Sequence, residues 1–230
     1  MHHRSSSQGF TRKELLVAAV LIFMLVFYFA EELGITHYHG KPVRAKASSV
    51  AKDGRDVYTV LSAWAADNNG EFPTARQFSN EAFRELFKAR LVDNEKLFAI
   101  KGDVWHKNSP TGDGRTPDNE IGTEPDYSQA LMPGECAWAY ATGLNEKSDP
   151  QLPLLANAFT ESVGVYTDDK SRKGGLFLGE KCAWVTVTGS AKASELSPDF
   201  RLREIKDGQK TDVFSKAWGT NPDDIKNPEG

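Results

Sequence analysis

The sequence predicts an α+β fold, with an N-terminal membrane helix and a second helix packed on a small antiparallel β-sheet. Three observations lead to this prediction. Residues 15–30 are apolar without interruption, residues 43–66 repeat apolar side chains at helical spacing, and residues 136–143 and 182–189 alternate with the two-residue period of a strand. The 230 residues are enough for one domain of ordinary size beyond the apolar segment.

The first element is the apolar segment, the 16 residues from Leu15 to Ala30. As a helix it is ~24 Å long, against ~30 Å for the hydrocarbon core of a bilayer. Arg12 and Lys13 precede it and Glu31 and Glu32 follow it, which favours a cytoplasmic N-terminus and a C-terminal domain outside. The alternatives are a buried helix of a soluble core, although the run is apolar on all sides, and a cleaved secretory signal, although AEELG lacks a small-residue cleavage pattern.

An acidic residue, Glu14, stands at the start of the apolar segment, where moving a carboxylate into lipid is unfavourable. By itself, Glu14 is also explained as a helix-start acid that faces the positive end of the helix dipole. The surrounding residues read Gly9-Phe10-Thr11, two basic residues, and then Glu14-Leu15-Leu16. This pattern resembles the class III signal of type IV pilins and of the pseudopilins of type II secretion.

The resemblance implies a processing and assembly pathway. A prepilin peptidase in the inner membrane would cut between Gly9 and Phe10 and methylate the new amine of Phe10, which makes 1–9 a leader peptide and 10–32 the transmembrane and assembly helix. Glu14 would then meet the N-terminal ammonium of a neighbouring subunit in the filament. In a low dielectric such a pair fixes axial register, because misplaced subunits leave a charge unpaired.

The second element is a helix predicted over residues 43–66, after a linker at 33–42 that is rich in helix-breaking residues. Its apolar residues recur about every 3.6 positions, with Gly54 as a weak link of about 1 kcal/mol. The DNNGEFP sequence at 67–73 ends this helix, because Asn and Gly suit left-handed backbone and proline cannot continue it. The helix and its exit resemble the corresponding part of a pseudopilin-like group.

A shorter amphipathic helix is predicted to follow, with Ser79 and Asn80 as candidate N-caps and Leu91 at its end.

The next segment, 107–126, is polar and acidic. It is interpreted either as a solvated surface loop or as a calcium site, since oxygen ligands on a flexible loop suit that ion. The D-x-D-x-D-G register is missing, so no ligand is assigned. The acidic residues of the segment are Asp113, Asp118, Glu120, Glu124 and Asp126.

The strands of the sheet are predicted from two stretches that repeat each other. CAWAYATG at 136–143 and CAWVTVTG at 182–189 share Cys, Ala, Trp, Thr and Gly at the same spacing. If both lie in one sheet, Cys136 and Cys182 can approach each other, which leaves two alternatives open: a disulfide, if their Cα atoms lie within ~7 Å, or two buried free thiols. A disulfide requires that this domain lie outside the cytoplasm.

Further strand segments are predicted around this pair. Residues 152–159 and 162–166 read as short strands, and 191–196 completes a hairpin after the turn at Thr188-Gly189-Ser190. The globular head is therefore expected over 43–207. The last residues, 208–230, are rich in turn formers, and we expect an irregular tail there that resembles the tail of the same pseudopilin-like group.

No catalytic motif is found, so the chain is predicted not to be an enzyme and to need no cofactor, apart from the calcium alternative above. The sequence has no G-x-S-x-G, H-E-x-x-H or phosphate-binding loop. Outside the leader it has three histidines, His37, His39 and His106. The pair His37 and His39 lacks a nearby third metal ligand, and strand cysteines followed by Ala-Trp indicate core packing more than a nucleophile.

Two functions are consistent with these features. The first is a structural subunit of a pilus-like filament, a type II secretion pseudopilus or a type IV pilus. It would be anchored in the bacterial inner membrane with a periplasmic head and would assemble with other pilin or pseudopilin subunits. The second is an uncleaved single-pass protein that presents a periplasmic binding domain. The chain after residue 30 carries 25 basic and 31 acidic residues, a net charge of −6, which argues against nucleic acid as a partner.

Overall fold

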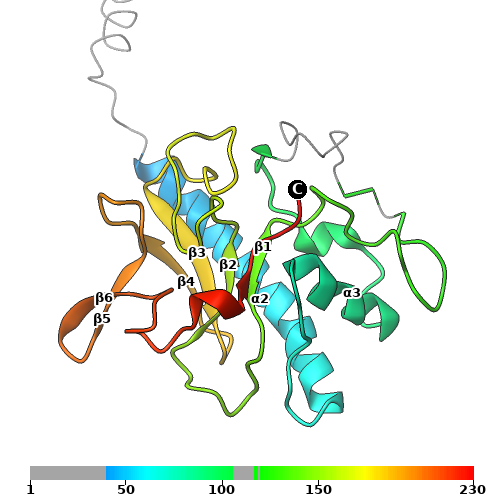
Figure 1. Ribbon diagram of the computed structural model, residues 1–230. Coiled ribbons are helices and arrows are strands. Elements are labelled where there is room, and N and C mark those ends of the chain that lie inside the picture. The colour runs from blue at the N-terminus through cyan, green and yellow to red at the C-terminus, as the bar shows by residue number, and fades with distance from the viewer. Residues whose placement is uncertain (1–39, 106–116, 119) are drawn as a thin grey trace, which may run out of the picture. The chain divides into compact units, whose positions relative to one another are not determined.

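The computed structural model describes residues 40–105, 117–118 and 120–230, and side chains from residue 46 onward. Val43–Gly230 forms one compact unit. It is an α+β structure, with helices packed against a five-stranded antiparallel sheet (Figure 1). The predicted α+β class is therefore confirmed.

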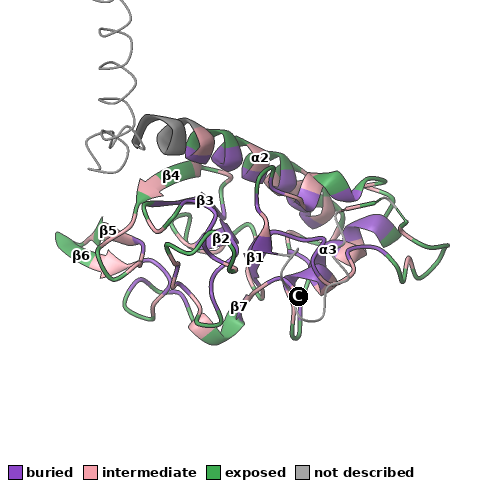
Figure 2. Ribbon diagram, turned by 90° about the horizontal axis from the view of Figure 1, so that it is seen from above, coloured by how far each residue is buried: buried purple, intermediate pink, exposed green. Residues whose placement is uncertain are grey.

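The long helix α2 (Gly40–Asp67) lies across one face of the sheet and turns its buried side toward it (Figure 2). That side repeats at helical spacing, as the sequence predicts, and the residues that carry it are Ala47, Val50, Ala51, Val57, Leu61 and Ala65. The helix ends where predicted. Asn69 and Gly70 adopt positive φ, and the Gly70 N–H donates to the Ala65 carbonyl at 2.8 Å.

The second helix, α3 (Ser79–Lys88), is followed by the 3₁₀ helix η1 (Glu95–Phe98). The predicted caps of α3 are wrong. The N-cap is Phe78, which makes no side-chain cap, while the Ser79 hydroxyl donates to the Trp138 carbonyl at 2.7 Å and the Asn80 amide to the Leu131 carbonyl at 2.8 Å. Both side chains are fully buried, so they tie the start of α3 to the rest of the head.

The main sheet has the strand order β4-β3-β2-β1-β7, and every pair in it is antiparallel. All residues of β1, β2 and β3 are buried, because structure covers both faces of these central strands. The predicted strand regions at 136–143, 152–159, 182–189 and 191–196 are confirmed, whereas 162–166 contributes one isolated bridge at Val165. The strands are β1 (Trp138–Ala141), β2 (Pro153–Asn157), β3 (Lys181–Thr186), β4 (Ala191–Glu195) and β7 (Ile225–Lys226).

The last residues of the chain differ from the expected irregular tail at 208–230. β5 (Arg203–Lys206) and β6 (Gln209–Asp212) form a separate hairpin, seen at the left of Figure 1. Farther on, η3 (Pro222–Asp224) leads into β7, which pairs with β1 at the edge of the main sheet. The sequence missed this strand because two residues are too few to show a period.

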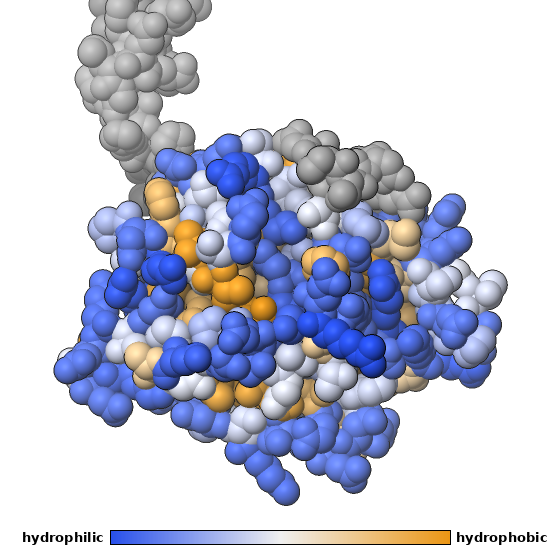
Figure 3. All heavy atoms as spheres, in the orientation of Figure 1, coloured by the Kyte–Doolittle hydropathy of each residue, from blue (hydrophilic) through white to orange (hydrophobic). Residues whose placement is uncertain are grey.

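The core has one apolar cluster on each face of the sheet. The larger cluster joins α2 and α3 to the sheet and includes Trp138 and Tyr140. The smaller one lies on the opposite face and includes Trp184 and Phe214. The face seen in Figure 3 is hydrophilic over most of its area, and Leu178 and Ile205 are the large apolar side chains exposed in the described part of the head.

Candidate functional site

The predicted processing and assembly residues, Gly9, Phe10 and Glu14, lie outside the described residues, as do His37, His39 and His106. Within the described ranges, no helix combines the length and the apolar character that crossing a membrane requires. The membrane helix predicted at 10–32 lies before the first described residue, Gly40.

Cys136 and Cys182 are two buried free thiols, so the disulfide alternative is not what the structure forms. The reason is the register of the two repeated stretches. Ala156 of β2 pairs with Ala139 of β1 on one side and with Trp184 of β3 on the other, so Trp184 aligns with Ala139 across the sheet. In the repeated sequence, Trp184 corresponds to Trp138. This one-residue offset turns the two copies to opposite faces. Cys136 accordingly packs in the α2-side cluster and Cys182 in the other one.

Burial also decides the chemistry of these two thiols. It raises the pKa of Cys136 and the pKa of Cys182 to about 12, because the thiolate loses its hydration. A thiol of that kind is a weak nucleophile and a weak metal ligand at neutral pH. Both cysteines therefore act as core residues.

The structure divides the acidic segment at 107–126 into residues with different environments. Asp113 lies outside the described residues. Glu124 forms an exposed ion pair with Arg90, at 2.6 Å between Oε2 and an Arg90 nitrogen, and accepts a hydrogen bond from the Tyr127 hydroxyl at 3.0 Å. Asp118 approaches Glu95 and Glu135, which come from η1 and from the residues before β1.

Glu95, Asp118 and Glu135 form a carboxylate cluster, with one oxygen from each residue within 4.8 Å of the others. Glu95 and Glu135 are buried, and each accepts a 2.6 Å hydrogen bond from a backbone N–H, that of Leu131 and that of Met132 respectively. Three carboxylate oxygens suit a hard cation such as calcium. The sequence identified Asp118 alone, because the two glutamates come from segments distant in the chain.

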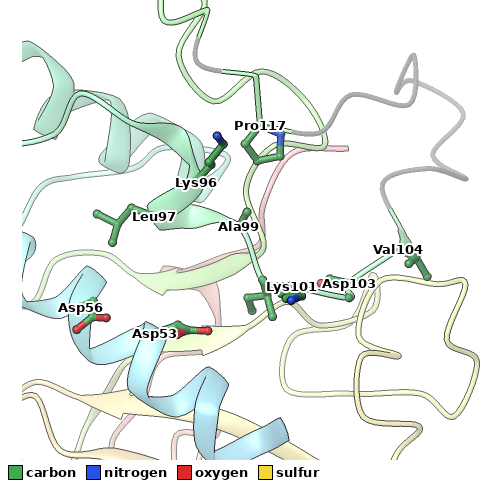
Figure 4. Close-up of a pocket in the computed structure, with 11 residues that line it drawn as sticks. Asp53, Asp56, Lys96, Leu97, Ala99, Lys101, Asp103, Val104 and Pro117 are labelled. Atoms are coloured by element: carbon green, nitrogen blue, oxygen red, sulfur yellow. The ribbon is translucent and has the colours of Figure 1, made fainter.

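A second feature is a cavity of about 570 Å³ between the middle of α2 and the segment that runs from η1 to Val104. Asp53 and Asp56 extend from α2 on one side, and Lys96, Ala99 and Pro117 line the other (Figure 4). The sequence alone did not indicate this site. The one local signal was the KDGRD sequence at 52–56, where the two aspartates stand three positions apart and so share a face of the helix. The remaining lining residues are Leu97, Ile100, Lys101, Gly102, Asp103 and Val104.

Asp103 is the buried acid of this cavity, with 8% of its surface exposed. Burial raises the pKa of Asp103 to about 6, and hydrogen bonds from the backbone N–H groups of Trp105 and Val104 and the charge of Lys46 oppose the shift. On the cation side, burial lowers the pKa of Lys46, and so does the neighbouring Lys170. Asp103 is thus an anion held in place by backbone donors and short of solvation.

We expect Asp103→Asn to remove one part of the pH dependence of stability. Since the pKa of Asp103 is raised from 3.8 to about 6, the folded state binds the proton more tightly than the unfolded state. The contribution of Asp103 to stability is therefore most favourable below pH 4, falls as the pH rises from 4 through 6, and is constant above that. A shift of ~2 pKa units corresponds to roughly 3 kcal/mol, and Asn carries no such charge. Lys46 and Lys173 are the cations whose charges act on Asp103.

Urea unfolding of the wild type and of Asp103→Asn between pH 4 and pH 7.5 measures this effect. It is the difference between the two plots of unfolding free energy against pH. Asp93→Asn, which neutralises an exposed acid outside the cavity, is the matched control and should retain the wild-type slope. If Asp103→Asn ran parallel to wild type over that range, Asp103 would not be the titrating group.

The fold and the site together define an α+β head with a five-stranded antiparallel sheet, a carboxylate cluster and a charged cavity. Comparisons with protein families, with curated proteins and with solved structures found no match to this chain.

Proposed function

We propose that the protein is a structural subunit of a pilus-like filament, a type II secretion pseudopilus or a type IV pilus. The observation that carries the proposal is the sequence Gly9-Phe10-Thr11, followed by Glu14-Leu15-Leu16 at the start of an apolar run. That pattern resembles the class III signal, in which the peptidase site, the assembly acid and the apolar helix occur in this order. The role is mechanical and includes no reaction.

The described head is consistent with such a subunit. α2 begins at Gly40, eight positions after the expected end of the membrane helix at residue 32, so the two helical segments follow each other closely in the chain. The head exposes few large apolar side chains among its described residues. Retention in the membrane would then depend on the apolar segment 10–32, and assembly would transfer that segment from lipid into the core of the filament.

Glu14 and the new N-terminus at Phe10 would supply the register of the filament. After cleavage, the ammonium of Phe10 in one subunit can pair with the carboxylate of Glu14 in the next. Among packed apolar helices the dielectric is low, so an unpaired carboxylate is strongly unfavourable. The pair would therefore select one axial position over its neighbours, whatever its net effect on stability.

We expect Glu14→Ala to leave membrane insertion intact and to abolish incorporation into filaments. The apolar run is unchanged, so the variant should still fractionate with the inner membrane, whereas the register charge is lost. Sheared filaments and membranes from the same cells, probed for the full chain, measure both effects. Glu32→Ala, at the other end of the apolar run, is the matched control and should assemble. Normal assembly of Glu14→Ala would refute the role of this residue.

The second candidate is an uncleaved single-pass protein that presents an acidic periplasmic binding domain. Arg12 and Lys13 favour it, because they place two charges within the segment that a filament would bury. The intact mass of the protein isolated from membranes decides between the two. Loss of residues 1–9, with or without a methyl group on Phe10, supports the filament subunit, and retention of these residues supports the second candidate.

A further inference from the structure

The cavity between α2 and the segment from η1 to Val104 is a site that the filament function does not use. Its volume of about 570 Å³ lies within the range of roughly 300 to 1,000 Å³ typical of small-molecule pockets. Its lining combines charged side chains with the apolar Leu97, Ile100 and Val104 and with Pro117. The ligand class follows from which of these charges are fixed, how far apart they lie, and what surrounds them.

The fixed charges of the cavity are negative. Asp103 is buried and held by backbone donors, and Asp53 is partly buried on α2. Lys96 and Lys101 are exposed, and their long stems allow the ammonium groups to turn toward water. No lining carboxylate forms an ion pair with another described residue. A cation in the cavity would thus meet oriented carboxylates, whereas an anion would rely on mobile lysines.

Lys46 and Lys173 act on Asp103, whereas the two acids of the cavity that lie on α2 repel each other. Burial raises the pKa of Asp53, and the neighbouring Asp56 raises it further against the weaker effect of Lys52. Two carboxylates on one helical turn therefore disfavour each other in the ionised state. A ligand that brings a positive charge between them relieves this repulsion.

The three acids of the cavity do not form a close set of ligands for a single metal ion. In the described residues, three carboxylates approach closely enough to hold one ion at the Glu95, Asp118 and Glu135 cluster, and Asp53, Asp56 and Asp103 form no such set. They line one cavity whose lining also includes the apolar Leu97 and Val104 (Figure 4). Separated carboxylates with an apolar lining match a cation whose charge is carried on a hydrocarbon stem.

We propose that this cavity binds an organic cation, an ammonium or guanidinium group on an apolar stem, with Asp53, Asp56 and Asp103 as its anionic partners. The same chemistry has two sources, a free amine or the side chain of an arginine or lysine in another protein. All the residues that line the cavity belong to the head, so binding of either source can be measured there.

Calorimetric titration of the full chain with agmatine, which carries a guanidinium and an ammonium on a four-carbon stem, tests the proposal. We expect saturable binding to wild type and about tenfold weaker binding to Asp53→Asn, the loss of one close charge interaction. Asp67→Asn, an exposed acid at the far end of the same helix, is the matched control and should bind as wild type does. Circular dichroism verifies that each variant is folded.

Replacing a lysine of the cavity tests the sign of the ligand's charge. Lys101→Ala should strengthen agmatine binding, because it removes a like charge. Competition by a capped arginine peptide would identify a protein side chain as the source, and binding of agmatine without that competition would identify a free amine. The proposal is overturned if agmatine does not bind, if Asp67→Asn weakens binding as much as Asp53→Asn does, or if Lys101→Ala weakens it.

Discussion

Asn227→Ala is expected to lower the free energy of unfolding by about 3 kcal/mol, and with it the melting temperature by roughly 6 to 12 °C. The Asn227 side chain accepts a hydrogen bond from the Phe159 N–H at 3.0 Å and donates to the carbonyls of Phe159 and Thr160 at 3.0 and 2.8 Å. Phe159 is fully buried and Thr160 nearly so. Alanine would leave these backbone groups without that partner, and water cannot readily replace it.

The effect is large because Asn227 is one of several attachments of the same short segment. The backbone carbonyl of Asn227 accepts from the Ser79 N–H at 3.1 Å. The Glu229 N–H donates to the Asn80 side chain, and the Glu229 carbonyl accepts from the Gly134 N–H, both at 2.9 Å. Lys173 donates to the Pro228 carbonyl at 2.8 Å. Residues 225–229 thereby connect the start of α3, the turn at Gly134 that precedes β1, and the loop after β2. Loosening one of these attachments therefore loosens the others.

Thermal and urea unfolding of the purified chain measure this prediction. Asn221→Ala is the matched control, since Asn221 is exposed and its side chain donates one hydrogen bond, to Asp224. It should change stability by less than about 0.5 kcal/mol. Asn227→Asp retains the acceptor for Phe159 and loses the two donated bonds, so it should also be destabilising. A loss below about 1 kcal/mol in Asn227→Ala would show that these bonds do not anchor the segment.

Gly54→Val is expected to destabilise the head by about 3 kcal/mol or more, although valine has the higher helix propensity. A Cβ at Gly54 would lie 2.8 Å from Trp138 Cη2 and 2.9 Å from Val185 Cγ2, closer than such atoms approach in proteins. Both neighbours are fully buried, so neither can move aside. Gly54→Ala should show the same sign with a smaller loss, in which the clash outweighs the gain of about 1 kcal/mol from helix propensity.

Two further variants separate the contact from the helix. Ala63→Val introduces the same β-branched side chain on the exposed side of α2 and should cost less than about 1 kcal/mol. Val185→Ala removes one of the atoms that the new Cβ would meet, so the double variant with Gly54→Ala should lose less stability than the sum of the two single variants. Additive losses would show that α2 does not approach the sheet closely at Gly54.

Gly54 illustrates how much of the structure a local sequence pattern can predict. The sequence predicted the helix and counted Gly54 as a weak link in it, and α2 is present over the predicted range. The pattern of that helix gave no reason for a glycine, because the reason lies in Trp138 of β1 and Val185 of β3. Glycine lowers the helix propensity here and in exchange lets α2 lie close to the sheet.

The candidate sites divide in the same way. Asp118 was identified as part of an acidic segment, but its neighbours Glu95 and Glu135 belong to other segments and could not be predicted. The cavity combines α2 with residues about 50 positions farther along the chain, and each half looks like an ordinary charged surface in the sequence. Sites built from distant segments leave no local spacing to recognise.

The sequence by itself determined the local elements of the described head: the helix at 43–66 and its exit, the strand regions, and the α+β class. These follow from the 3.6-residue and two-residue periods, which depend on neighbouring residues alone. Only the tertiary structure decided which face each strand buries, why Cys136 and Cys182 stay apart, and that β7 completes the sheet edge. Register is a property of the pairing between strands, and a shift of one residue exchanges the two faces, so a strand's own sequence cannot specify its side.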